Sequence, residues 1–171
     1  RYLRHYSVVN AIAFDDNAMT KIFGALTEWW IRKSEIPKDV ARVQNSLVVA
    51  SIDLYRTVQR ELLPTPTKSH YTFNLRDVSK VFQMICSASA ASVPDPSSLT
   101  RLWVHESLRV FQDRLTDDPD RQWFFETVKT LTEKHFLNIK FDKCFEHLDS
   151  DGDGSVDANE LRKLMFGDFL V

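Results

Sequence analysis

Apolar side chains recur at spacings of three and four residues through most of the chain, a pattern that is typical of helices burying one face. Five stretches carry it: Met19, Ile22, Phe23, Leu26 and Trp30; Val40, Val43, Leu47, Leu54 and Val58; Leu75, Val78, Phe82 and Ile85; Val104, Leu108, Phe111 and Leu115; Phe124, Val128 and Leu131. We therefore predict an all-α fold in which five helices form a bundle.

Residues that favour helix starts stand ahead of most of these stretches. Acidic side chains interact favourably with the first turn, Asn and Asp cap it, and proline fits its first position. The second helix is expected to run to about Leu63 and the fifth to about Phe136. The expected start residues are Asp15 and Asp16, Pro37, Asn74, and Asp118 with Pro119.

Three segments interrupt the helical pattern. Residues 7–14, SVVNAIAF, are β-branched and apolar, so we predict one short strand there whose partner strands are missing. Residues 64–73, PTPTKSHYTF, are expected to form a loop because they contain two prolines. Residues 87–98, SASAASVPDPSS, are mostly small and polar, and we expect them to be the most flexible segment.

Composition indicates a soluble domain with a substantial core. Hydrophobic residues make up 43% of the 171 residues and the formal net charge is -2. This balance argues against a general nucleic-acid or membrane surface, and no apolar run is long enough to cross a bilayer. Cys86 and Cys144 have no paired spacing, so we expect reduced thiols in a cytosolic setting. The start RYLRHY and the apolar end suggest a fragment of a longer protein.

Residues 149–160, DSDGDGSVDANE, form an acidic loop between two short apolar stretches, one with Phe141 and Phe145, the other with Leu161 and Leu164. Its oxygen-bearing residues fall at loop positions 1, 3, 5, 7, 9 and 12 of an EF-hand, with glycine at position 6. Calcium takes about six to eight oxygen ligands, which alternating acids can wrap around one point. The expected ligands are Asp149, Asp151, Asp153, Ser155 through its carbonyl, Asp157 through a water, and Glu160 with both oxygens.

Two other interpretations of the acidic loop stay open. One is an acidic turn that fits the pattern by chance. The other is a loop that binds Mg²⁺, or that binds Ca²⁺ too weakly to matter. EF-hands usually occur in pairs, and only one such pattern is present in the sequence. A titration with Ca²⁺ distinguishes these alternatives.

Residues 73–77, FNLRD, place a base where local rules disfavour one. If Asn74 caps the third helix, Arg76 lies in its first turn, where the helix dipole favours acids. A cation beside free backbone N–H groups makes a site for an anion such as phosphate. The alternative is that Arg76 pairs with Asp77 or with solvent.

Other candidate sites are weaker. His70, His105 and His135 are scattered without ligand spacing, and we interpret them as surface or hydrogen-bonded core residues. The tryptophans lie within helical patterns and are expected in the core or in a groove; they are Trp29, Trp30, Trp103 and Trp123. The sequence has no G-x-x-x-x-G-K-[ST] phosphate loop and no arrangement of a catalytic triad, so we predict no enzymatic activity for the chain alone.

Two long strings are distinctive: ELLPTPTKSHYTFNLRDVSKVFQMI at 61–85 and LTRLWVHESLRVFQDRLTDDPDRQWF at 99–124, with RYLRHYSVV and FDDNAMTKIF ahead of them. These strings closely resemble dynein heavy chains of the axonemal type. The resemblance covers about residues 1–138 and points to the third AAA+ module of a motor ring. It implies that residues 1–13 end the large α/β subdomain with its last strand, that 14–138 form the helical lid, and that 139–168 form an EF-hand.

The resemblance also implies roles for individual residues. Arg76 matches the sensor-2 position, which reaches from the lid to the phosphates of ATP or ADP. Arg1 and Arg4 lie where AAA+ modules place residues that face a neighbouring nucleotide. Some inner-arm heavy chains, which LRKLMFGDF at 161–169 also resembles, carry an EF-hand-like insertion here. The Walker motifs lie elsewhere in such chains, so the ATPase activity would belong to the parent chain.

Two functions therefore compete. In the first, the chain is part of an ATP-driven ciliary motor that moves along microtubules, with the other AAA+ modules of the same heavy chain as partners and a calcium-binding EF-hand that regulates it. Its place would be the cytoplasm and cytoskeleton, in the axoneme of a cilium or flagellum. In the second, the chain is a stand-alone calcium sensor or adaptor on a helical scaffold. The strand predicted at residues 7–14, whose partner strands are missing, favours the motor function.

Overall fold

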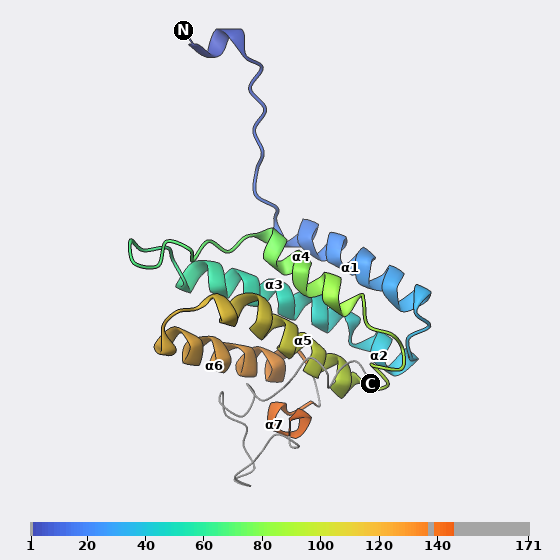
Figure 1. Ribbon diagram of the computed structural model, residues 1–171. Coiled ribbons are helices and arrows are strands. Elements are labelled where there is room, and N and C mark those ends of the chain that lie inside the picture. Colours follow the sequence, from blue (N-terminus) through green and yellow to red (C-terminus); the bar gives the residue numbers. More distant parts are fainter. Residues whose placement is uncertain (1, 137–138, 146–171) are drawn as a thin grey trace.

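The computed structural model describes residues 2–136 and 139–145. Every regular element in these ranges is helical, which confirms the all-α prediction (Figure 1). In chain order they are η1 (Tyr2–His5), α1 (Asp16–Lys33), α2 (Lys38–Arg42), α3 (Gln44–Glu61), α4 (Leu75–Ile85), α5 (Pro96–Phe111), η2 (Gln112–Arg114), α6 (Asp118–His135) and α7 (Phe141–Cys144).

Five long helices make up the bundle. α1 and α6 both pack on α3, and α4 packs on α5 (Figure 1). The short α7 contacts α5 and α6 on the side away from α1. The core between the helices is rich in large aromatic side chains, each less than 2% exposed: Phe23, Trp30, Phe82, Trp103, Phe111, Phe124 and Phe136. Such residues contribute most of the apolar area that a small bundle buries.

Helix caps occur close to where the sequence predicts them. Asp15 caps α1 by accepting a hydrogen bond from the Ala18 N–H at 3.0 Å. Asn74 caps α4, as predicted. For α6 the prediction was one residue late, because Asp117 holds the cap position and Asp118 is the first helical residue. The Asp117 side chain makes no capping bond there, and it pairs instead with Lys68 at 2.6 Å.

The predicted second helix is two helices. The chain breaks at Val43, whose N–H bonds to the Val40 carbonyl at 3.1 Å in a tight turn. Val40 and Leu47, on opposite sides of the break, are both almost fully buried at 0% and 1% exposure. No proline or glycine marks this break in the sequence, so local pattern alone does not reveal it.

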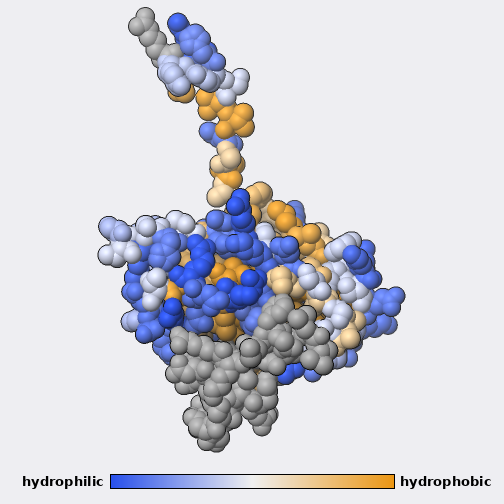
Figure 2. Space-filling model, in the orientation of Figure 1, coloured by the Kyte–Doolittle hydropathy of each residue, from blue (hydrophilic) through white to orange (hydrophobic). Residues whose placement is uncertain are grey.

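The strand predicted for residues 7–14 is not formed in the described part of the chain. Residues 7–15 have no regular structure and project from the bundle, and their apolar side chains are exposed, as Val9 at 89% and Ile12 at 91% show (Figures 1 and 2). A strand requires hydrogen bonds to a neighbouring strand. No segment within residues 2–136 or 139–145 supplies one.

The segment of residues 87–95 is anchored rather than loose. The Trp30 indole N–H donates to the Ala88 carbonyl at 3.0 Å, and Val93 is buried at 1% exposure. Asp95 then caps α5, accepting from the Ser98 N–H. The flexibility expected of residues 87–98 stays a prediction. The Trp30 hydrogen bond comes from a distant helix, whereas the Asp95 cap is a local contact.

α1 buries only part of its predicted apolar stripe. Met19, Phe23 and Trp30 are in the core, whereas Ile22 and Leu26 are 41% and 47% exposed. Trp29, expected in the core or a groove, is 54% exposed next to them. α1 lies at the edge of the bundle, so part of its apolar surface faces outward, and Figure 2 shows apolar atoms along this edge. No helix in the described ranges is long and apolar enough to span a membrane.

Candidate functional site

The start of α4 is a fully formed capping box. The Asn74 side chain accepts a hydrogen bond from the Arg76 N–H at 2.9 Å, and the Asp77 carboxylate accepts one from the Asn74 N–H at 3.0 Å. These two bonds satisfy backbone donors that a helix start otherwise leaves free. The direction and position of the first turn are thereby set by its own sequence.

A residue from a distant element completes this corner. Arg114, in η2, forms an ion pair with Asp77 at 3.1 Å. The Asp77 side chain is only 5% exposed, so it requires a cation or donors to offset the cost of burying its charge. Lys80 contributes a weaker contact to Asp77 at 3.5 Å from the next turn. Asp77 is therefore paired without help from Arg76.

Arg114 also holds the loop ahead of α4. Its guanidinium donates to the backbone carbonyls of His70 and Thr72, at 2.9 and 3.3 Å, and lies over the Phe73 ring at 4.8 Å. In return, the His70 ring donates to the Arg114 carbonyl at 3.1 Å. One side chain thus fixes both the carboxylate inside the first turn and the backbone that leads into it.

A second polar group secures the same loop to the start of α6. The Tyr71 hydroxyl donates to Asp120 at 2.9 Å and accepts from the Thr116 N–H at 3.1 Å. Lys68 bridges Asp117 and Asp120, and the hydrogen bonds to these two carboxylates raise the pKa of Lys68 above its usual range. Residues 68–73 are consequently bound along their length to the α5–α6 corner.

Arg76 is what remains unpaired at this corner. It lies in the first turn of α4 and is exposed. Within the described residues its side chain forms no hydrogen bond or ion pair, so the predicted alternative of pairing with Asp77 is not what the structure contains. A guanidinium that is held at a helix start and left without a counter-charge is available to an anion.

The N-terminal segment joins the bundle near the same place. Arg56 on α3 donates to the Phe14 carbonyl at 3.0 Å and pairs with Asp16 at 2.7 Å. Gln59, less than one turn further along α3, donates to the Phe73 carbonyl at 3.4 Å. The end of α3 therefore holds both the segment that precedes α1 and the loop that precedes Arg76. Arg4, in η1, is exposed and donates to the His5 ring at 3.1 Å; Arg1 lies outside the described residues.

The predicted calcium ligands also lie outside the described residues, as do both ends of the acidic loop. Among the residues that are described, no group of three or more His, Cys, Asp or Glu side chains is placed to hold a metal. The donor set of the predicted ligands nevertheless suits calcium, because carboxylate and carbonyl oxygens are the ligands of this hard cation. The six predicted ligands are Asp149, Asp151, Asp153, Ser155, Asp157 and Glu160.

Other titratable groups have structural partners. Glu106 on α5 is fully buried, and burial by itself acts to raise the pKa of its carboxyl. Hydrogen bonds from His105 and Arg109 outweigh this effect and hold the pKa of Glu106 below its ordinary value. Both cysteines are free thiols, and burial raises the pKa of Cys86 to about 11. Burial likewise raises the pKa of Cys144. Neither thiol is thereby a reactive nucleophile in the folded chain.

Sequence reasoning missed the role of Arg114. Its partner Asp77 lies on another element, and nothing in the string surrounding Arg114 indicates the pairing. A buried carboxylate at the third position of a helix does signal that a cation is needed nearby, but it does not say which one supplies it.

Comparison with known proteins agrees with these observations. The AAA+ lid domain matches residues 47–147, and the EF hand domain matches residues 140–167. Dynein axonemal heavy chain 12 of Homo sapiens is 39% identical over 170 residues, covering 99% of this chain and 5% of its own length. Dynein axonemal heavy chain 3 of Homo sapiens is 40% identical over 170 residues, 99% of this chain and 4% of its own. Dynein axonemal heavy chain 1 of Homo sapiens is 40% identical over 144 residues, 78% of this chain and 3% of its own.

The chain thus spans 5% or less of the length of these relatives. Its similarity to axonemal dynein heavy chains is confirmed over nearly all of its residues. The matched region contains most of α3 and all of α4 to α7, and it makes up more than half of the sequence. The chain belongs to the AAA+ lid domain family.

Proposed function

We propose that the chain is a nucleotide-sensing lid in an axonemal dynein heavy chain, in which Arg76 contacts the phosphates of ATP or ADP and the acidic loop binds calcium. The observation that carries the nucleotide role is the charge pairing at the start of α4. Arg114 neutralises Asp77, and Arg76 is left exposed without a partner among the described residues. Its charge is therefore free to act on an anion that the lid meets.

The geometry suits a lid that reports on a bound nucleotide. A phosphate held by Arg76 would also face the start of α4, whose dipole attracts negative charge. Because Arg114 ties the first turn of α4 to η2 and to the loop ahead of it, a pull on Arg76 would move the corner as one body. Nucleotide exchange would thus be converted into rigid motion of the whole bundle.

We place the parent chain in the axoneme of cilia or flagella, within the cytoplasm and cytoskeleton, as a microtubule motor. The basis is its similarity to axonemal dynein heavy chains. The other AAA+ modules of the same heavy chain are its immediate partners. ATP hydrolysis belongs to the parent chain, because the chain of residues 1–171 contains no phosphate-loop motif.

The exposed apolar surfaces suit a lid inside a larger chain. Ile22, Leu26 and Trp29 line the outer side of α1, and residues 7–14 present further apolar side chains nearby (Figure 2). A free-standing sensor would leave both surfaces in water, at the cost of solubility. We propose that other parts of the heavy chain cover them, with residues 7–14 completing a strand of the large subdomain.

The nucleotide role is tested with R76A in the full heavy chain. We expect nucleotide-dependent response in this module to fall at least tenfold, because a charge-assisted contact to phosphate is lost. The matched control is R42A, since Arg42 is an exposed arginine of α2 at the other end of the bundle that pairs only with Asp39 among the described residues (Figure 1). An unchanged response in R76A would refute the sensor role.

Calcium binding is tested by calorimetric titration of the 171-residue chain. We expect binding of one ion, and a loss of affinity of at least tenfold in E160Q, because the Gln amide keeps only one ligand oxygen and carries no charge at the predicted bidentate position. E61Q is a suitable control, since Glu61 lies at the end of α3 and pairs with Arg60. No heat at millimolar Ca²⁺ would reject the calcium element and leave the nucleotide role intact.

A further inference from the structure

The helix that leads toward the acidic loop is built into the bundle. Phe141 and Phe145, at the start and just after the end of α7, are each 0% exposed, and Cys144 between them is 5% exposed. A four-residue helix has no stability of its own in water. Its burial against the bundle is therefore what maintains it.

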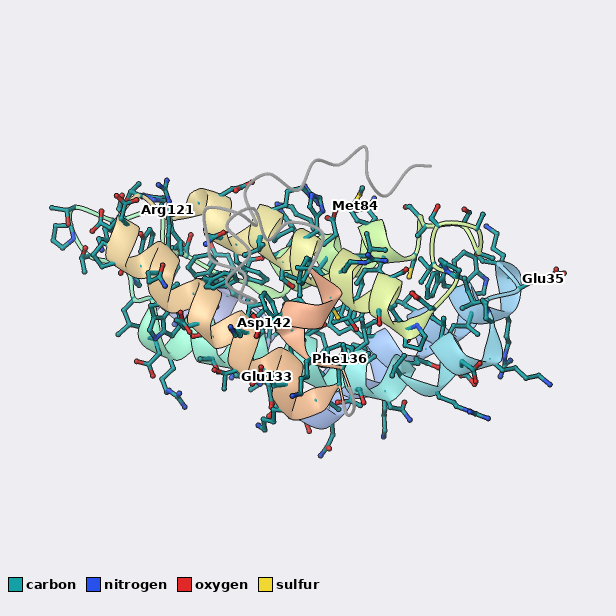
Figure 3. The ribbon with its side chains drawn as sticks, turned by 90° about the horizontal axis from the view of Figure 1, so that it is seen from below. Glu35, Met84, Arg121, Glu133, Phe136 and Asp142 are labelled. Atoms are coloured by element: carbon teal, nitrogen blue, oxygen red, sulfur yellow. The ribbon has the colours of Figure 1, made fainter. Side chains whose placement is uncertain are left out.

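Two residues of α6 make the specific contacts. The Phe125 ring meets the Phe141 ring edge to face, with centroids 5.6 Å apart. Lys129, one turn further, pairs with Asp142 at 2.9 Å and lies 5.7 Å from the centre of the Phe141 ring. α7 also contacts α5. Figure 3 shows α7 with Asp142 lying across the long helices, near the end of α6 that carries Glu133 and Phe136.

We infer that the α5–α6 face of the lid performs for this EF-hand the positioning that a second hand performs in paired EF-hands, with Phe125 and Lys129 as positioning residues. This inference rests on the proposed calcium binding. The matched EF hand domain begins at residue 140, so α7 is its first helix. That helix is already formed and oriented by the lid, and the first ligand, Asp149, follows Phe145 closely in the sequence.

The physical consequence is a linkage between ion binding and α7 docking. If the loop binds calcium only while α7 is docked, the observed affinity falls with the docked fraction, and calcium in turn stabilises the docked state. Through the same linkage, calcium binding would affect the helical bundle, because α7 contacts α6 and α6 packs on α3 in the core.

Cys144 supplies a direct readout. It is buried within α7, and burial raises the pKa of its thiol, so labelling by a thiol reagent requires α7 to undock. The rate at Cys144 in the native 171-residue chain is measured by mass spectrometry, which separates it from labelling at Cys86. At a Ca²⁺ concentration about a hundred times the calorimetric Kd, we expect labelling at Cys144 to slow by about a hundredfold.

Substitution tests the two positioning residues. K129M is expected to speed Cys144 labelling about twofold to fivefold without Ca²⁺, because it removes a partly buried ion pair. F125L is expected to speed it by up to about tenfold, since the edge-to-face contact is lost. The control is K134M, because Lys134 lies on the same helix but pairs with Asp53 on α3.

Each outcome decides something different. Calcium binding by calorimetry with an unchanged Cys144 rate overturns the inference while leaving the proposed calcium site intact. No calcium binding at all overturns both. Equal labelling rates in K129M, K134M and the unsubstituted chain would remove Lys129 from its positioning role, and F125L then decides whether aromatic packing alone docks α7.

Discussion

The start of α4 is held by polar groups, whereas α7 is held by aromatic packing. At α4, Asp77 receives Arg114 and the Asn74 N–H, and the loop ahead is bound by backbone hydrogen bonds. At α7, two fully buried phenylalanines supply most of the contact, with one ion pair at the rim. Hydrogen bonds and ion pairs have directional geometry, so they suit a helix start that holds a charged side chain in a fixed position. Apolar packing is not directional and tolerates small shifts more readily.

The start of α4 and α7 also differ in the charged side chains that they leave unpaired among the described residues. The polar corner satisfies its own carboxylate and leaves one cation, Arg76, for something outside the described chain. At α7 the ion pair recorded among the described residues is that of Lys129 with Asp142. From this comparison we propose that the first region contacts a ligand directly, while the second positions a binding loop. Substitutions in the two regions should therefore differ in how much stability they cost.

Removing the aromatic anchor should have the largest effect. F141A is expected to lower the free energy of unfolding by about 3–5 kcal/mol, because a fully buried ring is replaced by a cavity. Chemical denaturation of the 171-residue chain measures it. F14A is the control: Phe14 is 52% exposed where the N-terminal segment joins α1, and its loss should cost less than about 0.5 kcal/mol. A loss below about 1 kcal/mol in F141A would show that packing does not hold α7.

Breaking the polar corner should rank second. R114M is expected to cost about 2 kcal/mol, because Asp77 stays buried without its main cation but keeps the Asn74 N–H and Lys80. Denaturation midpoints of R114M and R42M give the comparison, since Arg42 pairs with Asp39 in a fully exposed setting where about 0–1 kcal/mol is at stake. Equal losses in the two variants would mean that Asp77 does not depend on Arg114.

Sequence reasoning succeeded where cause and effect are local. The Asn74 cap, the Asp15 cap and the helical stripes all follow from neighbours within one or two turns, and the structure contains them. It failed where the deciding partner is distant: the anchoring of residues 87–95 through Trp30, the pairing of Asp77 with Arg114, and the outward face of α1. The strand at residues 7–14 stays a prediction, because pairing is a property of two segments and the described residues supply no partner strand.

Some features of the candidate site also follow from local sequence, whereas others depend on distant residues. The unusual position of Arg76 was visible because it conflicts with the helix dipole, a local rule. That it is left unpaired depends on Arg114, which no local rule connects to it. For the acidic loop the spacing of oxygens is likewise local, and the ligand assignment from Asp149 to Glu160 stays a prediction that calorimetry tests.

Removing the cap alone should cost less than removing Arg114. N74A is expected to destabilise the chain by about 1 kcal/mol, the usual contribution of a side-chain cap at a helix start. N10A is the control, because Asn10 lies in the exposed segment of residues 7–15. If N74A costs nothing, the first turn of α4 is held by Arg114 and Asp77 alone, and the capping bond seen at 2.9 Å is dispensable.

The smallest change in stability should accompany the largest loss of function. R76E is expected to raise the free energy of unfolding of the chain by about 0.5 kcal/mol, because it replaces a cation in the first turn of α4 with an anion that the helix dipole favours. In the full heavy chain the same change should abolish the nucleotide response of this module. Thermal unfolding of the 171-residue chain gives the first quantity, with R76Q as an intermediate that removes the charge without reversing it. A destabilised R76Q would mean that Arg76 holds the fold together through a partner of its own, and the argument that its charge is kept for a ligand would fail.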